Sequence, residues 1–111
     1  MKHRSKRDAL NVNVRVREPG QETPFGHLID LSMNGLSVSG QGIPVSADVH
    51  TVELLLPWPM HGIDVVLLEV ERRWLDYTDT GRWHAGYQIR HCPEQAILAL
   101  EHLSAAFADK A

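Results

Sequence analysis

The stretch that decides the fold of this chain runs Gly26-His27-Leu28-Ile29-Asp30-Leu31-Ser32-Met33-Asn34-Gly35-Leu36-Ser37-Val38-Ser39. A short apolar run at residues 26–31 precedes a polar turn, and a second short run at residues 36–39 follows it. The pair Asn34-Gly35 accepts the positive φ values of tight hairpin turns. The sequence therefore predicts an antiparallel β-hairpin whose turn lies at residues 32–35.

Further strand candidates lie on both sides of this hairpin. Before it, valines alternate with polar residues over 12–17, the period-2 pattern of a strand with one buried face. After it, apolar stretches separated by glycine, proline and polar turns predict strands at residues 49–56, 63–74 and 83–89. These candidates follow one another at hairpin spacing, which favours an antiparallel sheet.

The last part of the chain changes character and predicts a helix. Proline and glutamate at positions 93 and 94 suit the first turn of a helix. Apolar residues then follow at helical spacing: Ile97, Leu100, Leu103 and Phe107. We expect this C-terminal α-helix to span residues 93–108.

Together these elements predict an all-β fold, a six-stranded antiparallel β-barrel with a C-terminal α-helix. Barrel closure removes exposed sheet edges, and the helix can cover the side or the mouth of the barrel. We expect one domain over residues 1–111. Within it, residues 1–9 are a flexible basic N-terminal arm and residues 10–91 form the barrel.

The composition narrows the class of protein. The chain has 111 residues, of which 43% are hydrophobic and 23% charged, as in an ordinary soluble domain. No apolar run approaches the ~20 residues of a membrane-spanning helix, so we expect no membrane insertion. No apolar segment follows the basic start, so we expect no secretory signal. The single Cys92 excludes an internal disulfide, and we expect a cytoplasmic location.

The charge is unevenly distributed. The first seventeen residues carry a net charge of about +5, whereas the whole chain carries −3. A domain that coats nucleic acid usually has a basic excess throughout and a pI above about 9, but the pI here is near 6.1. The local positive charge therefore favours a small anionic ligand or a surface contact, and we expect no nucleic-acid partner.

No arrangement of residues predicts catalysis or metal binding. A nucleophile elbow, a P-loop and a paired-carboxylate site are all missing from the sequence. The seven histidines form no H-x-x-x-H or H-E-x-x-H pattern. We therefore expect no enzyme, no catalytic residue, no metal and no cofactor.

The hairpin turn carries the most specific chemistry. Asp30 and Ser32 place a carboxylate and a hydroxyl side by side, and Gly35 allows the backbone to turn where a Cβ would clash. A carboxylate can accept two hydrogen bonds from the adjacent N1–H and amino donors of a guanine. The alternative is that Asp30 and Ser32 only close the turn through local hydrogen bonds.

Asp30-x-Ser32-x-x-Gly35 resembles the D/N-x-S-x-x-G motif of PilZ domains, which are bacterial receptors for cyclic di-GMP. In that family a basic R-x-x-x-R segment precedes the first strand, and the D/N-x-S-x-x-G motif follows some twenty to thirty residues later, as here. The late stretch Gly86-Tyr87-Gln88-Ile89 is similar to a family strand in which a glycine precedes an aromatic residue. The resemblance covers nearly the whole chain and implies the same barrel and helix.

The resemblance also assigns residues of the N-terminal arm. His3-Arg4-Ser5-Lys6-Arg7 aligns with the family pattern R-R-x-x-R. Arg7 matches the second arginine of R-x-x-x-R, and Arg4 matches the accessory arginine. His3 stands in place of the first arginine, which exchanges a permanently charged fork for an imidazole that is mostly neutral above pH ~6.5.

The implied ligand-binding residues are His3, Arg4, Arg7, Asp30, Ser32, Gly35 and Trp74. Arg4 and Arg7 would pair with phosphates or guanine acceptors, and Asp30 and Ser32 would hold a base. Trp74 aligns with a position that is aromatic in some family members, where it could stack on a base. The alternative for Trp74 is a place in the core, because it shares strand parity with Val66, Leu68 and Val70.

The sequence thus leads to a second-messenger receptor that binds cyclic di-GMP and signals through contact with an unidentified protein effector, as a monomer or weak dimer. The alternative is a PilZ-fold adaptor that binds no nucleotide and acts by protein–protein interaction in pilus assembly or motility. His3 favours the adaptor, and the intact Asp30-x-Ser32-x-x-Gly35 motif favours the receptor. A third interpretation, a small barrel for single-stranded nucleic acid, is disfavoured by the acidic remainder of the chain.

Overall fold

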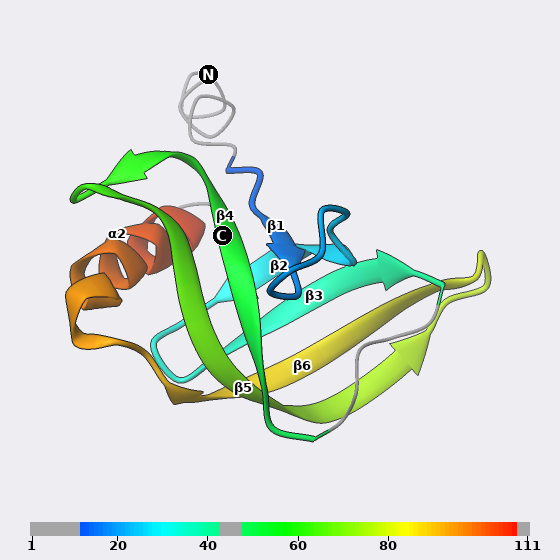
Figure 1. Cartoon of the computed structure of the whole chain (residues 1–111). Coiled ribbons are helices and arrows are strands. Elements are labelled where there is room, and N and C mark those ends of the chain that lie inside the picture. The colour runs from blue at the N-terminus through cyan, green and yellow to red at the C-terminus, as the bar shows by residue number, and fades with distance from the viewer. Residues whose placement is uncertain (1–11, 43–47, 109–111) are drawn as a thin grey trace, which may run out of the picture.

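The computed structural model describes residues 12–42 and 48–108. They form a closed antiparallel β-barrel with one C-terminal helix, as the sequence predicts (Figure 1). The strands are β1 (Arg15–Arg17), β2 (Gly26–Leu31), β3 (Gly35–Gln41), β4 (His50–Met60), β5 (Ile63–Tyr77) and β6 (Arg82–His91). A short 3₁₀ turn, η1 (Glu94–Ala96), leads into α2 (Ile97–Ala108).

The strands follow one another around the barrel in the order β1-β2-β3-β6-β5-β4, and β1 closes the ring by pairing with β4. Alternation along each strand sends one set of side chains inward. That set is dominated by β-branched and other aliphatic residues, together with Trp83 and Tyr87. The fully buried interior includes Val14, Val16, Val38, Val52, Leu54, Val66, Leu68 and Val70.

The hairpin of β2 and β3 forms where the sequence predicts it, but its turn has a different geometry. Neither Asn34 nor Gly35 has a positive φ, so the predicted positive-φ Asn-Gly turn is wrong. The turn is closed by local hydrogen bonds of Ser32 instead, and Gly35 already belongs to β3. The left-handed two-residue turn lies elsewhere: His61 and Gly62, at φ 53° and 78°, join β4 to β5.

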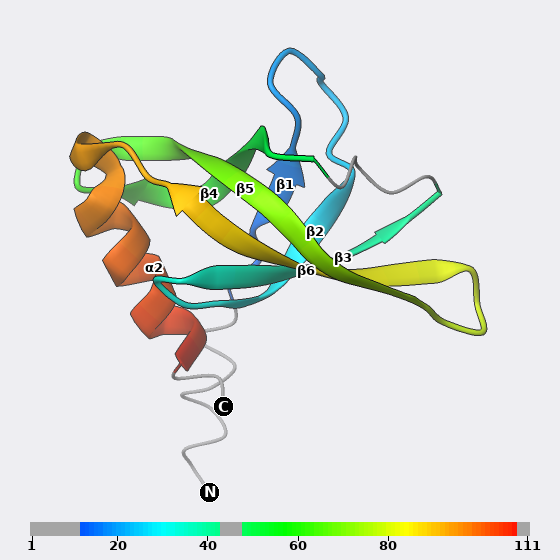
Figure 2. The ribbon, with the colours of Figure 1, turned by 90° about the horizontal axis from the view of Figure 1, so that it is seen from below.

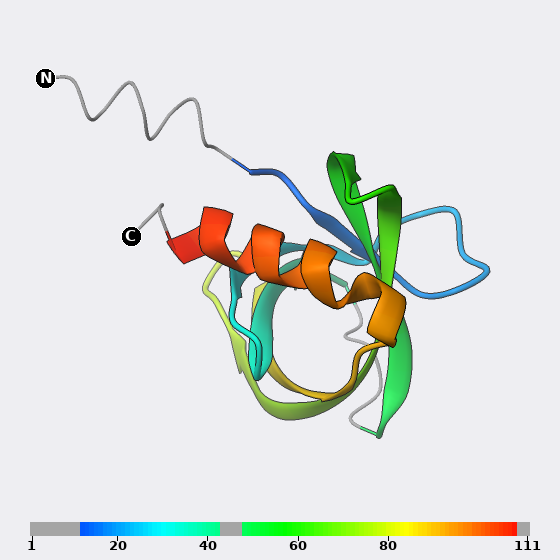
Figure 3. The same cartoon turned by 90° about the vertical axis from the view of Figure 1, so that its left-hand side faces the viewer.

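Helix α2 lies across one end of the barrel (Figure 3). It buries Ala99, Leu100, Leu103 and Phe107 against the strands. Its Ser104 hydroxyl donates a hydrogen bond of 3.4 Å to the carbonyl of Leu31, the last residue of β2. The β5–β6 hairpin extends away on the opposite side of the molecule (Figure 2). No helix within the described ranges is long and apolar enough to cross a membrane.

Candidate functional site

One lateral row of residues crosses four neighbouring strands on the outside of the barrel. Asp30 of β2 pairs with Ser37 of β3, Ser37 pairs with Gly86 of β6, and Gly86 pairs with Trp74 of β5. Their inward-facing neighbours Leu36, Val38 and Tyr87 are buried. The row therefore presents a carboxylate, a hydroxyl, a bare backbone and an indole on one outer face.

A β-bulge places Trp74 on this face. The pairing of β5 with β6 shifts between Arg72 and Trp74, so Arg73 is an additional residue in β5. The shift reverses the parity that Trp74 would otherwise share with Val66, Leu68 and Val70, and the Trp74 side chain is 48% exposed. The alternative that places Trp74 in the core is wrong.

Gly86 makes room for the indole. A Cβ atom at this position would overlap Nε1 and Cε2 of Trp74. The ring therefore lies against the backbone of β6, and Trp74 remains 48% exposed. This arrangement suits stacking of a second planar group.

The turn that follows Asp30 is closed by a backbone hydrogen bond of 2.8 Å from the Ser32 N–H to the Gly35 carbonyl and is reinforced by the Ser32 hydroxyl. Ser32 Oγ accepts hydrogen bonds from the backbone N–H groups of Asn34 (3.3 Å) and Gly35 (3.2 Å), and donates one to the Gly35 carbonyl (3.3 Å). One donor and two acceptors exhaust the capacity of a hydroxyl. Ser32 thus shapes the turn, which corresponds to the local hydrogen-bonding alternative considered for this residue.

Gly35 is required by the packing of two strands. A Cβ at Gly35 would stand 2.7 Å from the carbonyl oxygen of Tyr87 on β6. A side chain at this position would therefore push β3 away from β6. Such a displacement would disturb the row at Ser37 and Gly86.

Asp30 keeps much of its hydrogen-bonding capacity. Its Oδ1 accepts a hydrogen bond from the backbone N–H of Leu31 at 2.9 Å, and the residue is exposed. Its Oδ2 has no hydrogen-bond partner among the described residues. An exposed carboxylate with an open oxygen at the edge of a hollow can accept hydrogen bonds from a ligand.

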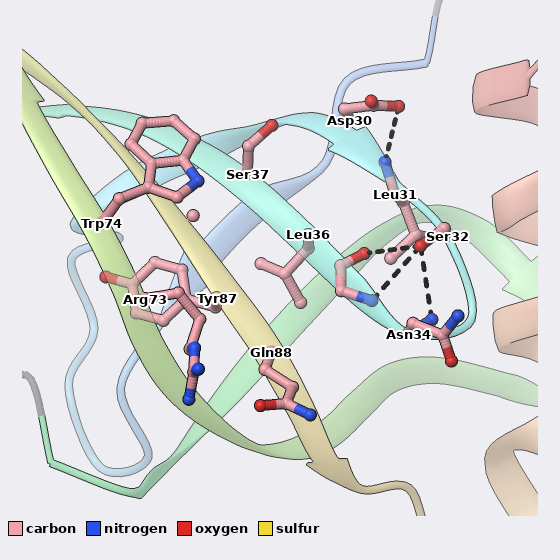
Figure 4. Close-up of a pocket in the computed structure, with 12 residues that line it drawn as sticks. Asp30, Leu31, Ser32, Asn34, Leu36, Ser37, Arg73, Trp74, Tyr87 and Gln88 are labelled. Atoms are coloured by element: carbon pink, nitrogen blue, oxygen red, sulfur yellow. Dashed lines mark hydrogen bonds between the residues drawn. The ribbon is translucent and has the colours of Figure 1, made fainter.

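The row forms the floor of an open hollow of about 640 Å³, here called the tryptophan pocket (Figure 4). This volume lies within the range of about 300–1,000 Å³ that is typical of small-molecule sites. The residues that line it come from β2, β3, β5, β6 and the 32–35 turn: Asp30, Leu31, Ser32, Asn34, Gly35, Leu36, Ser37, Arg73, Trp74, Gly86, Tyr87 and Gln88.

Four of the residues expected to bind ligand thus meet at one pocket: Asp30, Ser32, Gly35 and Trp74. The other three, His3, Arg4 and Arg7, lie outside the described residues. The described chain nevertheless starts close to Asp30. The N–H of Leu28 donates to the carbonyl of Val14 at 2.8 Å, so residues 12–14 run antiparallel to β2 toward Asp30.

Eight of the lining residues were not predicted as site residues, and Ser37, Gln88 and Arg73 are the ones among them whose side chains can supply polar groups from the strands. Ser37 and Gln88 supply a hydroxyl and an amide, and Gln88 is exposed. Arg73 supplies a guanidinium that is only loosely paired, because its Nη1 lies 3.7 Å from Glu71 and its side chain is 58% exposed. The pattern Ser37-x-Ser39 with outward parity could have indicated Ser37. The position of Arg73 at the pocket depends on the β-bulge in β5, which the sequence does not predict.

Tyr87 lies under this pocket with its ring inside the barrel. Burial raises the pKa of its phenol, and the hydroxyl has no hydrogen-bond partner among the described residues. The phenol is therefore neutral at cellular pH and contributes packing beneath the floor of the site.

Comparisons of the sequence with protein-family models and with curated proteins give no match.

Proposed function

We propose that this chain is a PilZ-type receptor that binds cyclic di-GMP in the tryptophan pocket. The observation that carries the proposal is the row Asp30–Ser37–Gly86–Trp74, which joins a guanine-type acceptor and a stacking surface across four strands. The motif resemblance led to Asp30 and Trp74 separately, and the barrel topology brings both to one hollow.

In this proposal Asp30 accepts hydrogen bonds from the N1–H and amino groups of one guanine. Trp74 stacks on a base, a contact worth about 1–3 kcal/mol in proteins that bind single-stranded nucleic acid. Ser32 and Gly35 act as positioning residues, since Ser32 fixes the turn and Gly35 permits close packing of β3 on β6.

The basic arm supplies the charge that the phosphates require. Arg7 is five residues before Val12, and an extended chain of that length spans at most about 18 Å. In this proposal Arg7 and Arg4 contact the phosphates of a ligand in the pocket from this segment. Contact between the ordered arm and a protein effector would pass the signal on.

Titration calorimetry with the whole chain tests the proposal. We expect saturable heat with cyclic di-GMP, and none with GTP or a short single-stranded oligonucleotide. Arg7→Ala, Asp30→Ala and Trp74→Ala should each weaken binding about tenfold or more. The matched control is Trp58→Ala, because Trp58 is 47% exposed and lies outside the pocket.

Absence of heat with cyclic di-GMP, in protein whose circular dichroism shows a folded barrel, would overturn the receptor. That result would favour the adaptor without a nucleotide ligand. Equal losses in Trp74→Ala and Trp58→Ala would remove the tryptophan pocket from the proposal.

A further inference from the structure

A second hollow lies one row along the same outer face. Arg15 of β1 pairs with His27 of β2, and His27 pairs with Ser39 of β3. These residues and Arg82 line a hollow of about 510 Å³, here called the arginine pocket. No aspartate or glutamate is among its lining residues in the described chain, although the whole chain has a net charge of −3.

Arg82 is fixed in position over this pocket. Its Nε and Nη2 donate hydrogen bonds of 3.2 and 2.9 Å to the hydroxyl of Ser39, which is only 4% exposed. A guanidinium has five N–H donors, so three remain after these two bonds. A hydroxyl on the neighbouring strand therefore holds the fork without neutralising its charge.

The two arginines of this pocket differ in their ion pairing from three other arginines of the barrel. Arg17, Arg73 and Arg90 each form an ion pair with a glutamate. Arg15 and Arg82 form none with any residue in the ranges 12–42 and 48–108. Two arginines without a carboxylate partner thus face one acid-free hollow.

We infer that the arginine pocket binds the phosphate group of a small phosphate ester. Two inter-strand spacings of about 4.8 Å separate Arg15 from Ser39, whose hydroxyl holds the guanidinium of Arg82. In this inference a phosphate in the pocket accepts hydrogen bonds from Arg15 of β1 and from Arg82 of β6. One guanidinium group can occupy both oxygens of a carboxylate, whereas the oxygens of a phosphate can accept hydrogen bonds from two guanidinium groups. Pro24 and Phe25 add an apolar wall suited to the organic part of the ester.

This inference does not rest on the function proposed for the tryptophan pocket. The phosphate could belong to cyclic di-GMP itself or to a different ester. Amide NMR spectra of the ¹⁵N-labelled whole chain, recorded during titration with inorganic phosphate, GMP and cyclic di-GMP, separate these sources. We expect saturable shifts at the amides of Asn13, His27, Ser39 and Gln41.

Arg15→Gln is the decisive variant, because Arg15 is exposed and its side chain makes no hydrogen bond or ion pair with the described residues. It should weaken GMP and phosphate binding roughly tenfold. Arg90→Gln is the control, since it removes the same charge from an exposed residue outside both pockets. Arg82→Lys keeps the charge, loses the fork, and should also weaken binding.

The outcomes distinguish the two proposals. If the amides of the arginine pocket shift at lower concentrations of cyclic di-GMP than of GMP, the bound phosphate belongs to the dinucleotide. If they shift with GMP and not with cyclic di-GMP, the phosphate belongs to a separate ester. Shifts that do not saturate, or equal affinities in Arg15→Gln and Arg90→Gln, would overturn the inference. The amides of residues 30–35 report on the tryptophan pocket independently.

Discussion

The indole of Trp74 lies against Gly86 on the neighbouring strand, so closely that a Cβ at Gly86 would overlap the ring. Neither residue faces the core, and their contact sets the position of the one aromatic ring on the outer face of the proposed site. The glycine therefore acts through the tryptophan, and a pair of substitutions can demonstrate this dependence.

Gly86→Ala should displace the indole and weaken cyclic di-GMP binding about tenfold, through loss of a stacking contact worth about 1–3 kcal/mol. In a Trp74→Ala background the same change should have little further effect, because the displaced ring is already missing. Calorimetry on the four proteins of this double-mutant cycle measures the coupling. Additive losses would show that Gly86 acts independently of Trp74.

Ser32 and Ser37 are expected to respond in opposite ways. Ser32→Ala removes all three turn hydrogen bonds of its hydroxyl and should lower the free energy of unfolding by about 1 kcal/mol. Ser37→Ala removes a pocket hydroxyl that bonds to no described residue, so stability should change by less than about 0.5 kcal/mol. Urea denaturation measures both.

Ser37→Ala should also bind cyclic di-GMP more weakly than the wild type if the Ser37 hydroxyl contacts the ligand. Stability losses of equal size in the two variants would contradict the assignment of Ser32 as the residue that holds the turn.

Tyr87 should make the barrel sensitive to alkaline pH. Burial raises the pKa of its phenol in the folded state above the ordinary value of 10.0. The folded state therefore keeps the proton while the unfolded chain releases it. This contribution to stability is complete below pH 10 and declines above it, by up to ~1.4 kcal/mol per pH unit until the folded-state pKa is reached.

Tyr87→Phe should abolish that decline. At pH 8 the variant should be as stable as the wild type or more stable, because it removes a buried hydroxyl without a described partner. Urea denaturation at pH 8 and pH 11 measures the difference. Tyr77→Phe is the control, since Tyr77 is 64% exposed, and an identical pH response in both variants would exclude Tyr87 as the cause.

His3→Arg should tighten cyclic di-GMP binding at neutral pH. The arginine restores a charged bidentate donor, and such a contact is worth about 1–3 kcal/mol, or roughly tenfold to a hundredfold in affinity. Lowering the pH to about 5.5 should tighten binding to the natural chain, because the imidazole becomes protonated. His61→Arg, at the β4–β5 turn, adds the same charge away from the pocket. Unchanged affinity in His3→Arg would place His3 outside the site.

Much of the barrel could be predicted from local patterns. The alternating valines over 12–17 indicate the inward face of the first strand, and the helical spacing of Leu100, Leu103 and Phe107 indicates the buried face of α2. The run at 26–31 indicates a strand but not its inward face, because Ile29 is exposed.

The prediction that the strand starting at Val49 ends before Pro57 is wrong, because β4 continues through Pro57 and Pro59 to Met60. Both prolines fall in the irregular stretch between Leu55 and Met60, where their missing N–H groups are tolerated.

The site was less accessible to sequence reasoning, because it depends on pairing between distant segments. Asp30 and Ser32 could be found from their motif, but Ser37 and Gln88 join them only through the pairing of β3 with β6. The orientation of Trp74 depends on a bulge at Arg73, and alternation alone predicts the opposite face. Local patterns therefore indicated the chemistry, whereas register determined which groups meet.

The brevity of β1 has a consequence for self-association. Because β1 pairs with β4 only at residues 53–55, the end of β4 beyond Leu55 passes the last residue that β1 covers. An uncovered strand margin normally invites a second chain to add a strand. Here Pro57 and Pro59 have no backbone N–H groups, so two of the hydrogen bonds to an added strand cannot form. The two prolines therefore hinder the addition of a second chain along this part of β4.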